Sequence, residues 1–407
     1  MAIKRPVNAA VVGAGMMGKI FPGNVRRAGG EVIAYLGIDE QEARKAASDI
    51  NLFPKLFGSF QTDYETVLGR NDIDLVVIAT PNFLHDTMAI KAAEAGKHVL
   101  VEKPLAISTV KARSVYDAMM KAGVAGQINS QYRYAEVWDN VRAWVLEKTF
   151  GDPKYIEMKY VQDWQIDPDT PIGWRPEVAV AGKGKLVPDL GAHLMQTCFH
   201  VFGGEFETFD GKTYNVVRTR YRPQKGLKVE SFSGAKGAKL PTRSENPDIY
   251  EPMNMLDGSM FSGDDIAEAN FVLRTDAGVS VPGYYRLSQV DAGEKNHFTV
   301  SLVFDQGKIG WDQEHPNQLC ISGKDGQVKV FERGSAPGIV GSPPGHPHGY
   351  HDEIARELMD MYQVISDADY GHLSEGALKA YTGKNIGDAV RVVEACSKWL
   401  ERDLIQI

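Results

Sequence analysis

A charged pair and a proline follow a run of apolar residues near the end of the first hundred positions. The run at 99–101 favours a buried strand, and Glu102, Lys103 and Pro104 come directly after it. A lysine at such a strand end can hydrogen-bond a reacting oxygen and stabilise the negative charge that develops on it. Because a proline restricts the residue before it to extended conformations, Pro104 is expected to hold Lys103 in place. The alternative is a solvated ion pair on a turn.

Asp189 and His193 form a second candidate pair. They are four residues apart, so a helix at this position would put both on one face. A neutral imidazole can take a hydroxyl proton near neutral pH. Asp189 can contact a substrate hydroxyl, orient His193, or do both. The alternative for His193 is a buried structural histidine, which the presence of Asp189 and Lys103 makes the less favoured interpretation.

Glycines form a third pattern, G-x-G-x-x-G, at Gly13, Gly15 and Gly18. The segment NAAVVGAG at 8–15 is typical of a strand that ends in this turn, and a helix-like stretch follows. Such a turn lets the backbone approach a pyrophosphate, whose charge the helix N-terminus stabilises. Asp39, about 20 residues further on, would bind the ribose hydroxyls and repel a 2′-phosphate, which predicts NAD rather than NADP. The alternative is a packing turn with Asp39 as a helix cap.

Strands and helices alternate through the first third of the chain and would position these residues. Further strands are expected at 31–39 and 74–80, and helices at 83–96 and 108–123. This alternation indicates an α/β fold, a Rossmann doubly wound parallel sheet. Ligands of such sheets bind beyond the carboxyl ends of the strands, so Glu102 and Lys103 are expected to point into the crevice that takes the nicotinamide.

From about residue 151 the pattern changes to short alternating segments. The segments 154–162, 268–275 and 298–305 are typical of a largely antiparallel sheet, whereas long loops are expected over 205–262. Two helices follow, whose apolar faces consist of Ile354, Leu358, Met361 and Ile365, and of Ile386, Ala389, Val390 and Val393. The sequence thus predicts an NAD-binding Rossmann domain over 1–130 and an α+β domain for substrate binding and oligomerisation over 131–407.

Length and composition limit the classes of protein. A chain of 407 residues exceeds the usual size of one core, which favours two domains. The net charge of −8 argues against a nucleic-acid surface, and no run approaches the roughly 18 apolar residues of a membrane span. The N-terminus lacks an apolar leader pattern, so a cytoplasmic protein without nucleic-acid or membrane partners is expected. Cys198, Cys320 and Cys396 fit reduced core thiols rather than disulfides or a metal site.

Four motifs occur in the order found in the glucose–fructose oxidoreductase/inositol dehydrogenase (Gfo/Idh/MocA) family: VVGAGMMG at 11–18, ATPNFLH at 79–85, EKPLA at 102–106 and DLGAH at 189–193. The chain resembles this family well over about its first 200 residues and more loosely beyond them. The resemblance implies that Lys103, Asp189 and His193 are the catalytic set. It also implies that NAD contacts the residues of these turns, with Asn82 and His85 on the nicotinamide side: Gly13, Gly15, Met16, Met17, Gly18, Asp39, Thr80, Pro81, Asn82, His85, Glu102 and Lys103. A homodimer or homotetramer is expected, as is common in the family.

Three more segments are similar to a subgroup of that family, the levoglucosan-dehydrogenase-like members, which act on pyranosides and anhydrosugars: 161–175, 288–296 and 343–353. Trp164 and Trp174 are expected to stack on the apolar face of a sugar ring. Asp163 and Arg175 are expected to hydrogen-bond the sugar hydroxyls. Core or interface packing is the alternative for each tryptophan.

Other residues are candidates for substrate contact. Tyr132, Arg133 and Tyr134 follow the next sheet strand, so they are expected to face the substrate. Lys183 and Lys185 come shortly before Asp189 and, with Arg175, would receive an anionic substituent of the substrate. The alternative for both lysines is a solvent-exposed loop.

Three histidines, His346, His348 and His351, are clustered in the sequence. No matching carboxylate or cysteine pattern accompanies them, so no metal site is predicted. Carbohydrate contact, for His348 in particular, or a turn at a helix start is favoured.

These patterns predict an NAD-dependent sugar oxidoreductase in which Lys103 polarises the substrate oxygen and His193 removes its proton. The subgroup resemblance implies oxidation at C3 of a pyranoside. An alternative is an NAD-dependent glycoside hydrolase: transient C3 oxidation, elimination of the aglycone, addition of water and return of the hydride, with uronate or sulfonated glycosides among its candidate substrates. It needs a further base, for which Tyr132, Tyr134 or a histidine of 346–351 is a candidate. A third hypothesis, a non-catalytic regulator, predicts NAD binding without turnover.

Overall fold

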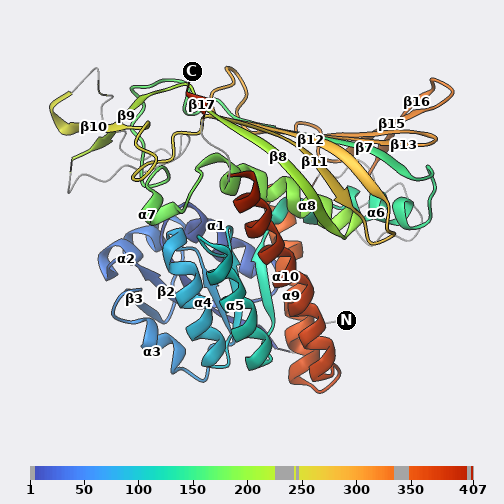
Figure 1. Cartoon of the computed structure of the whole chain (residues 1–407). Coiled ribbons are helices and arrows are strands. Elements are labelled where there is room, and N and C mark those ends of the chain that lie inside the picture. Colours follow the sequence, from blue (N-terminus) through green and yellow to red (C-terminus); the bar gives the residue numbers. More distant parts are fainter. Residues whose placement is uncertain (1–4, 225–242, 244–246, 334–347, 401–404, 407) are drawn as a thin grey trace. The chain divides into compact units, whose positions relative to one another are not determined.

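The computed structural model describes residues 5–224, 243, 247–333, 348–400 and 405–406. The chain forms two compact units (Figure 1). Unit 1 consists of Met1–Tyr134 and Gly349–Val393. Unit 2 consists of Ala135–His348 and Glu394–Ile407.

Unit 1 is built on a six-stranded parallel sheet with the strand order β3-β2-β1-β4-β5-β6. The order reverses between β1 and β4, and in doubly wound sheets this is where ligands bind. The predicted strands at 74–80 and 99–101 are confirmed as β4 and β5, in which every residue except the half-buried His98 is buried. The strands are β1 (Asn8–Val12), β2 (Glu31–Gly37), β3 (Leu56–Ser59), β4 (Leu75–Ile78), β5 (His98–Glu102) and β6 (Gly126–Asn129).

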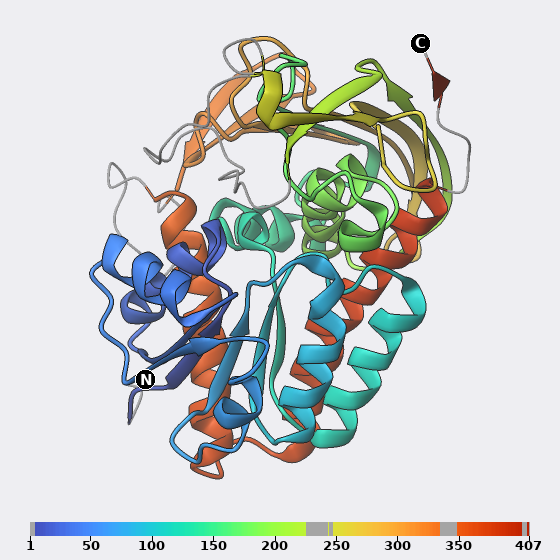
Figure 2. The ribbon, with the colours of Figure 1, turned by 90° about the vertical axis from the view of Figure 1, so that its left-hand side faces the viewer.

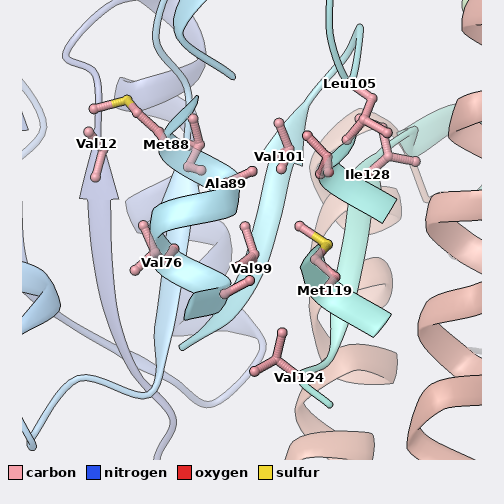
Figure 3. Close-up of a cluster of buried hydrophobic side chains, with 14 of the residues drawn as sticks. Val12, Val76, Met88, Ala89, Val99, Val101, Leu105, Met119, Val124 and Ile128 are labelled. Atoms are coloured by element: carbon pink, nitrogen blue, oxygen red, sulfur yellow. The ribbon is translucent and has the colours of Figure 1, made fainter. Parts of the chain in front are cut away.

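Helices cover both faces of this sheet (Figure 2). One face packs against α1 (Met16–Arg27), α2 (Glu40–Asp49) and α9 (Tyr350–Asp369). The other face packs against α3 (Tyr64–Leu68), α4 (His85–Glu94), α5 (Thr109–Ala122) and α10 (Glu375–Trp399). Figure 3 shows the second core, in which Val76, Val99 and Val101 of the sheet meet Met88 and Met119 of the helices. The predicted doubly wound α/β fold is thus confirmed.

The two last helices belong to unit 1 over 349–393, although the sequence-based division at residue 130 placed them in the second domain. The reason is their apolar faces, which complete the two cores of the parallel sheet. Ile354, Leu358, Met361 and Ile365 of α9 are buried with one core, and Ile386, Ala389, Val390 and Val393 of α10 with the other.

Unit 2 is built on a nine-stranded sheet with the order β16-β15-β14-β13-β7-β12-β11-β8-β17. The sheet is antiparallel except where β7 pairs with β12 and β8 with β17. The predicted strands 154–162, 268–275 and 298–305 are confirmed as β7, β11 and β13. The strands are β7 (Pro153–Val161), β8 (Glu205–Asn215), β11 (Ile266–Arg274), β12 (Ser280–Ser288), β13 (His297–Phe304), β14 (Gly307–Asp312), β15 (Gln318–Gly323), β16 (Val328–Glu332) and β17 (Ile405–Gln406).

The prediction of long loops over 205–262 was wrong for β8, an eleven-residue strand. Its buried side includes Gly211, Thr213 and Asn215, whose small or polar side chains hide the alternation expected of a strand. Gly211 is required by packing, because a Cβ there would lie 2.1 Å from Cδ1 of Trp399. Residues 225–242 and 244–246 of this stretch lie outside the described residues.

The remaining elements of unit 2 are helices α6 (Val137–Leu146), α7 (Val178–Ala181) and α8 (Ala192–Phe202), and a separate ribbon of β9 (Thr219–Pro223) and β10 (Tyr250–Asn254). A π-helical turn at Val187–Gly191 runs directly into α8. Across the described residues, no helix has the length and apolar composition to cross a membrane. Cys198 and Cys396 are buried as expected, whereas Cys320 is exposed because it lies on the outward side of β15.

A buried polar network ties α9 to the end of β6 in unit 1. Glu357 is completely buried, and its Oε1 accepts hydrogen bonds from Nε2 of Gln127 at 2.9 Å and from the backbone N–H of Ser130 at 3.2 Å. Burial is the main cause that raises the pKa of Glu357 to about 8, while Arg133 and the two donors oppose it. The native state therefore holds the proton that an exposed glutamate would release.

This shift predicts a pH dependence of stability. Between about pH 4.5 and pH 8 the native state binds more protons at Glu357 than the unfolded state does, so the free energy of unfolding falls as pH rises. The Glu357→Gln variant keeps the acceptor oxygen but loses the titration. In urea titrations, we expect its free energy of unfolding relative to that of the wild type to increase with pH, by at most about 1.4 kcal/mol per pH unit. The exposed Glu94→Gln serves as the control, and a constant difference for Glu357→Gln would contradict the assignment.

Candidate active site

Two glycines close the turn between β1 and α1 because side chains would not fit. Gly13 has a φ of +112°, and a Cβ on it would lie 2.3 Å from the carbonyl oxygen of Ala79, which follows β4. A Cβ on Gly18 would lie 1.9 Å from the carbonyl oxygen of Gly13. These glycines therefore let β1, β4 and α1 pack closely at the point where the strand order reverses.

Gly15 differs because a Cβ there would meet nothing within 4 Å. It is the N-cap residue of α1, and the first helical turn contains no acidic residue. Met16 and Met17 follow in that turn, and Met16 is exposed. A helix N-terminus that begins at an open, uncharged position fits the pyrophosphate of NAD.

Asp39 directly precedes α2 and is exposed. Its Oδ1 accepts a 2.7 Å hydrogen bond from the backbone N–H of Glu42, so it caps the helix, as the alternative interpretation expected. A cap at the end of β2 leaves the carboxylate at the sheet edge where ribose binds in this fold. Contact with the ribose is therefore compatible with the cap.

His85 supports the site and does not line it. The ring is only 1% exposed; Nδ1 lies 2.7 Å from the carbonyl oxygen of Pro104 and Nε2 lies 2.8 Å from that of Thr80. Burial lowers the pKa of His85. The ring of His85 thus links the turns after β4 and β5, and its predicted contact with the nicotinamide stays a prediction. Pro81 and Asn82 lie in the first of these turns and are half-buried.

Glu102 ends β5 and Lys103 follows it, but the two side chains lie in different environments. The carboxylate of Glu102 is buried; it contacts Nδ2 of Asn129 and accepts the backbone N–H of Lys103 at 3.2 Å. These contacts fix the turn after β5, and the predicted position of Glu102 beside the nicotinamide stays a prediction. Lys103 is half-buried and joined to Pro104 by a cis peptide bond.

The candidates Tyr132, Arg133 and Tyr134 lie in a short helical turn that follows β6, Gln131–Tyr134. Arg133 was predicted to face the substrate but is buried, 3.1 Å from Oδ1 of Asn385 and 3.8 Å from Asp388 on α10. Tyr132 is also buried and lies edge-on to Tyr350. Tyr134 accepts a 2.7 Å hydrogen bond from Gln127, and burial raises its pKa well above the ordinary value. This makes Tyr134 a poor general base.

Asp189 and His193 lie in unit 2, on the π-helical turn and in the first turn of α8. Oδ2 of Asp189 accepts a 3.2 Å hydrogen bond from Nε2 of Gln289 and lies 4.0 Å from Nε of Arg175. His193 is buried, with its ring edge-on to Tyr160 at 6.0 Å between centroids. A carboxylate and an imidazole on consecutive turns of one segment can serve proton transfer and substrate orientation.

The segment after β7 holds its tryptophan through side chains that the sequence reasoning missed. Nε1 of Trp164 donates to Oε1 of Gln162 at 2.7 Å, and Nε2 of Gln162 donates to Asn296 at 2.7 Å. Tyr160 also donates to Asn296, at 2.7 Å. Asn296 is the last residue of the segment 288–296. The signal in the sequence was that this segment and 161–175 both resemble the same subgroup of the family.

Asp163 and Trp174 have partners of their own within unit 2. Oδ2 of Asp163 accepts from Nζ of Lys295 at 2.6 Å, which reduces its capacity for a sugar hydroxyl. Trp174 is half-buried beneath the guanidinium of Arg175, whose Cζ lies 5.2 Å from a ring centroid. Arg175 therefore stands between an aromatic face and the carboxylate of Asp189.

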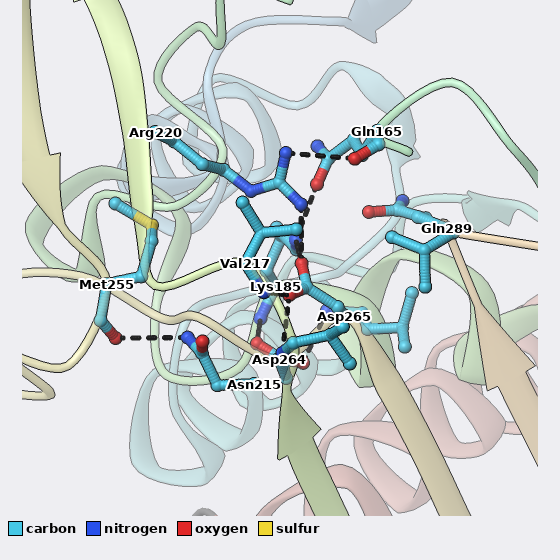
Figure 4. Close-up of polar contacts among 12 residues, drawn as sticks. Gln165, Lys185, Asn215, Val217, Arg220, Met255, Asp264, Asp265 and Gln289 are labelled. Atoms are coloured by element: carbon cyan, nitrogen blue, oxygen red, sulfur yellow. Dashed lines mark hydrogen bonds and ion pairs between the residues drawn. The ribbon is translucent and has the colours of Figure 1, made fainter. Parts of the chain in front are cut away.

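Lys183 and Lys185 lie in different environments. Lys183 is exposed, whereas Lys185 is 3% exposed and donates to Oε1 of Gln165 at 2.5 Å and to Oδ1 of Asp265 at 3.1 Å. Figure 4 shows Arg220 reaching the same carboxylate. Lys185 was predicted to bind the substrate, but here buried acidic and amide groups engage its ammonium group, which argues against that role.

The histidine cluster is split between different environments. His348 of unit 2 lies with Nδ1 3.8 Å from Glu136, and its N–H donates to Asn317 at 2.9 Å. His351 of unit 1 lies in the first turn of α9, where its Nδ1 lies 3.2 Å from Nδ2 of Asn24. His346 lies outside the described residues. Within the described parts of the chain, no group of histidine, cysteine and acidic residues could hold a metal ion.

The glycine turn and the lysine at the end of β5 define the class, an NAD-binding oxidoreductase. Within that class the chain belongs to the Gfo/Idh/MocA family. Residues 7–130 match the model described as "Oxidoreductase family, NAD-binding Rossmann fold". Residues 138–310 match the model of the GFO/IDH/MocA C-terminal domain, so the two models together span well over half of the chain.

Characterised relatives include sugar and polyol dehydrogenases. Levoglucosan dehydrogenase of Pseudarthrobacter phenanthrenivorans is 24% identical over 363 residues, 85% of this chain and 84% of its own. The NAD(+)-dependent scyllo-inositol 2-dehydrogenase of Bacillus subtilis is 24% identical over 64% of this chain and 75% of its own. A levoglucosan dehydrogenase solved with NADH and levoglucosan matches with a TM-score of 0.74 at 20% identity, covering 98% of this chain and 97% of that chain.

The open position at Gly15 yields a test of the cofactor site. In Gly15→Ala the new Cβ meets no protein atom, so stability should be unchanged, but it occupies the space that a pyrophosphate needs. We expect the affinity for NAD to fall by about tenfold or more, which is about 1.4 kcal/mol. Calorimetric titration with NAD measures this directly. Gly23→Ala, at an equally open position within α1, should bind NAD as the wild type does. Equal affinities in all three proteins would place the cofactor elsewhere.

Proposed function

We propose that this chain is an NAD-dependent dehydrogenase that oxidises a secondary hydroxyl, at C3, of a neutral pyranoside or related sugar. The observation that carries the proposal is the buried His193 one turn after a carboxylate, Asp189, which is itself fixed by Gln289. A rigid, largely desolvated acid–base pair of this kind is what removal of a hydroxyl proton needs.

In the proposed reaction His193 takes the proton of the substrate hydroxyl. Lys103 donates a hydrogen bond to the same oxygen and stabilises the negative charge that develops on it. NAD, when bound, supplies the acceptor for the hydride. Glu102 binds the backbone N–H of Lys103, and His85 contacts the carbonyl oxygen of Pro104. The backbone of the turn is thereby fixed, which limits the positions that the ammonium group of Lys103 can adopt.

A neutral substrate is favoured because Lys185 and Arg175, two of the predicted cationic contacts, lie next to carboxylates. Lys185 is engaged in a buried ion pair with Asp265, and Arg175 lies 4.0 Å from Asp189. An anionic substituent would have to compete with these carboxylates for the cations. The half-buried Trp164 and Trp174 instead offer aromatic faces suited to the apolar side of a sugar ring.

Oxidation at C3 is supported by the resemblance of the segments 161–175 and 288–296 to the levoglucosan-dehydrogenase-like subgroup. The similarity to a levoglucosan dehydrogenase over 84% of its length supports an anhydrosugar or pyranoside as the class of substrate. Redox-assisted glycoside hydrolysis has less support, because it needs a second base. The raised pKa of Tyr134 and the burial of Tyr132 count against both tyrosines.

A panel of neutral and anionic glycosides, incubated with NAD, distinguishes these reactions. We expect NADH to accumulate in step with a ketosugar, for neutral sugars in preference to anionic ones. Release of the aglycone without net NADH would instead establish the hydrolase. NAD binding with no turnover of any sugar would contradict both enzymes.

The role of Lys103 is tested by Lys103→Ala. Loss of the ammonium group should lower kcat by at least about 100-fold, because one preorganised donor to the reacting oxygen contributes that much. NAD affinity should change little. The exposed Lys121→Ala of α5 is the control and should behave as the wild type. An equal loss of NAD binding and turnover in Lys103→Ala would show that the lysine serves the cofactor site as a whole.

A further inference from the structure

The turn that carries Asp189 is fixed through its backbone by an acidic residue on a neighbouring loop. The carboxylate of Asp264 accepts the N–H of Lys185 at 2.8 Å and the N–H of Leu186 at 2.7 Å. Leu186 is the residue before the π-helical turn, so these bonds fix where the turn begins. Asp264 is buried, and its oxygens cap N–H groups as a helix N-cap would.

The side chain of Asp189 is fixed separately, by Gln289. Gln289 is 0% exposed, and its Nε2 donates to Oδ2 of Asp189 at 3.2 Å. Its own backbone is bonded on both sides: its N–H donates to the carbonyl of Asp265 and its carbonyl accepts the N–H of Gln165, each at 3.1 Å. Because only the amide nitrogen can donate to a carboxylate, Asp189 also determines which way round the Gln289 amide lies.

A buried charge cluster holds Gln165 and Asp265, the two backbone hydrogen-bond partners of Gln289. We define it as Lys185, Arg220 and Asp265 (Figure 4). Both cations donate to Oδ1 of Asp265, at 3.1 Å and 2.7 Å, and both bind Gln165, through its side chain and its carbonyl oxygen. Oδ2 of Asp265 accepts two backbone N–H groups, those of Val216 and Val217.

The charges of the cluster depend on one another. Burial alone would raise the pKa of Asp265, but Lys185 and Arg220 outweigh it and hold that pKa below its usual range. Removing Asp265 would leave two buried cations with no carboxylate between them, which is far more costly than leaving exposed charges unpaired. The segments around Gln165 and Asp265 are thus joined by interactions that tolerate little displacement.

We propose that Gln289 is a positioning residue that sets the orientation of the Asp189 carboxylate, with the buried charge cluster as its rigid support. The inference rests on the proposed function, in which Asp189 works beside His193. A carboxylate oriented through one oxygen by a neutral donor keeps its negative charge, which can act on the substrate or on the imidazole.

The test compares two substitutions at the same position. Gln289→Met keeps the approximate volume and removes the donor, so kcat should fall about 10- to 100-fold at every pH, with the KM for NAD unchanged. Gln289→Glu puts a second carboxylate against Asp189. Its kcat relative to the wild type should rise at least about tenfold from pH 9 to pH 6, as the introduced carboxyl gains a proton and becomes a donor again.

If Gln289 had a merely structural role, the kcat of both variants would fall by a factor that does not depend on pH. That result would overturn the proposal. Wild-type kcat in Gln289→Met would do so as well. Matched controls are Gln318→Met and Gln318→Glu, since Gln318 of β15 also donates its amide to a carboxylate, that of Glu332, at 3.3 Å. These controls should show neither the loss of kcat nor the pH-dependent recovery.

Crystal structures of the ligand-free wild type and Gln289→Met give a readout independent of turnover. We expect one position of the Asp189 carboxylate in the wild type, and a displaced or divided one in Gln289→Met with the Lys185–Asp265 pair intact. An unmoved Asp189 would overturn the positioning role. A wild type that oxidises no sugar would instead overturn the proposed function, while the crystallographic comparison still decides the role of Gln289.

Discussion

The close approach of backbone at Gly13 is the constraint on which unit 1 depends. The chain leaves β1 so near to β4 that no side chain fits at Gly13 or Gly18, and α1 starts directly above this contact. The turn after β4 then leads to His85, whose ring reaches the turn that carries Lys103. One steric requirement at the reversal of strand order thus fixes the helix N-terminus, the β4 turn and, through His85, the position of the lysine.

The two units solve the problem of buried charge in different ways. In unit 1, burial raises the pKa of Glu357 to about 8 although Arg133 and two neutral donors act against the shift, so this carboxyl keeps its proton at neutral pH. In unit 2, Asp265 is ionised because Lys185 and Arg220 both reach it. A proton held in one unit can be lost as pH rises, whereas an ion pair persists over a wide range. The two buried networks should therefore respond differently to pH.

Local patterns in the sequence were sufficient for the elements whose residues contact near neighbours. The continuous apolar runs gave β4 and β5, and the glycine spacing gave the turn before α1, because each depends on a few consecutive positions. The sequence could not distinguish Lys183 from Lys185, two residues apart: one is exposed, and the other pairs with Asp265, 80 positions away. Gln289 was missed for the same reason, since its partner is 100 positions distant.

Two cations share a single oxygen of Asp265, and this arrangement bears on how the family can diversify. Replacing Asp265 by a neutral residue would leave the ammonium group of Lys185 and the guanidinium of Arg220 together in the interior with no carboxylate between them, so a change at this position requires a matching change at one of the cations. The exposed Lys183 and the partly exposed residues of 163–175 are under no such constraint. Substitutions in these outer segments can therefore accumulate while the interior charges stay unchanged, which separates changes of the surface from changes of the fold.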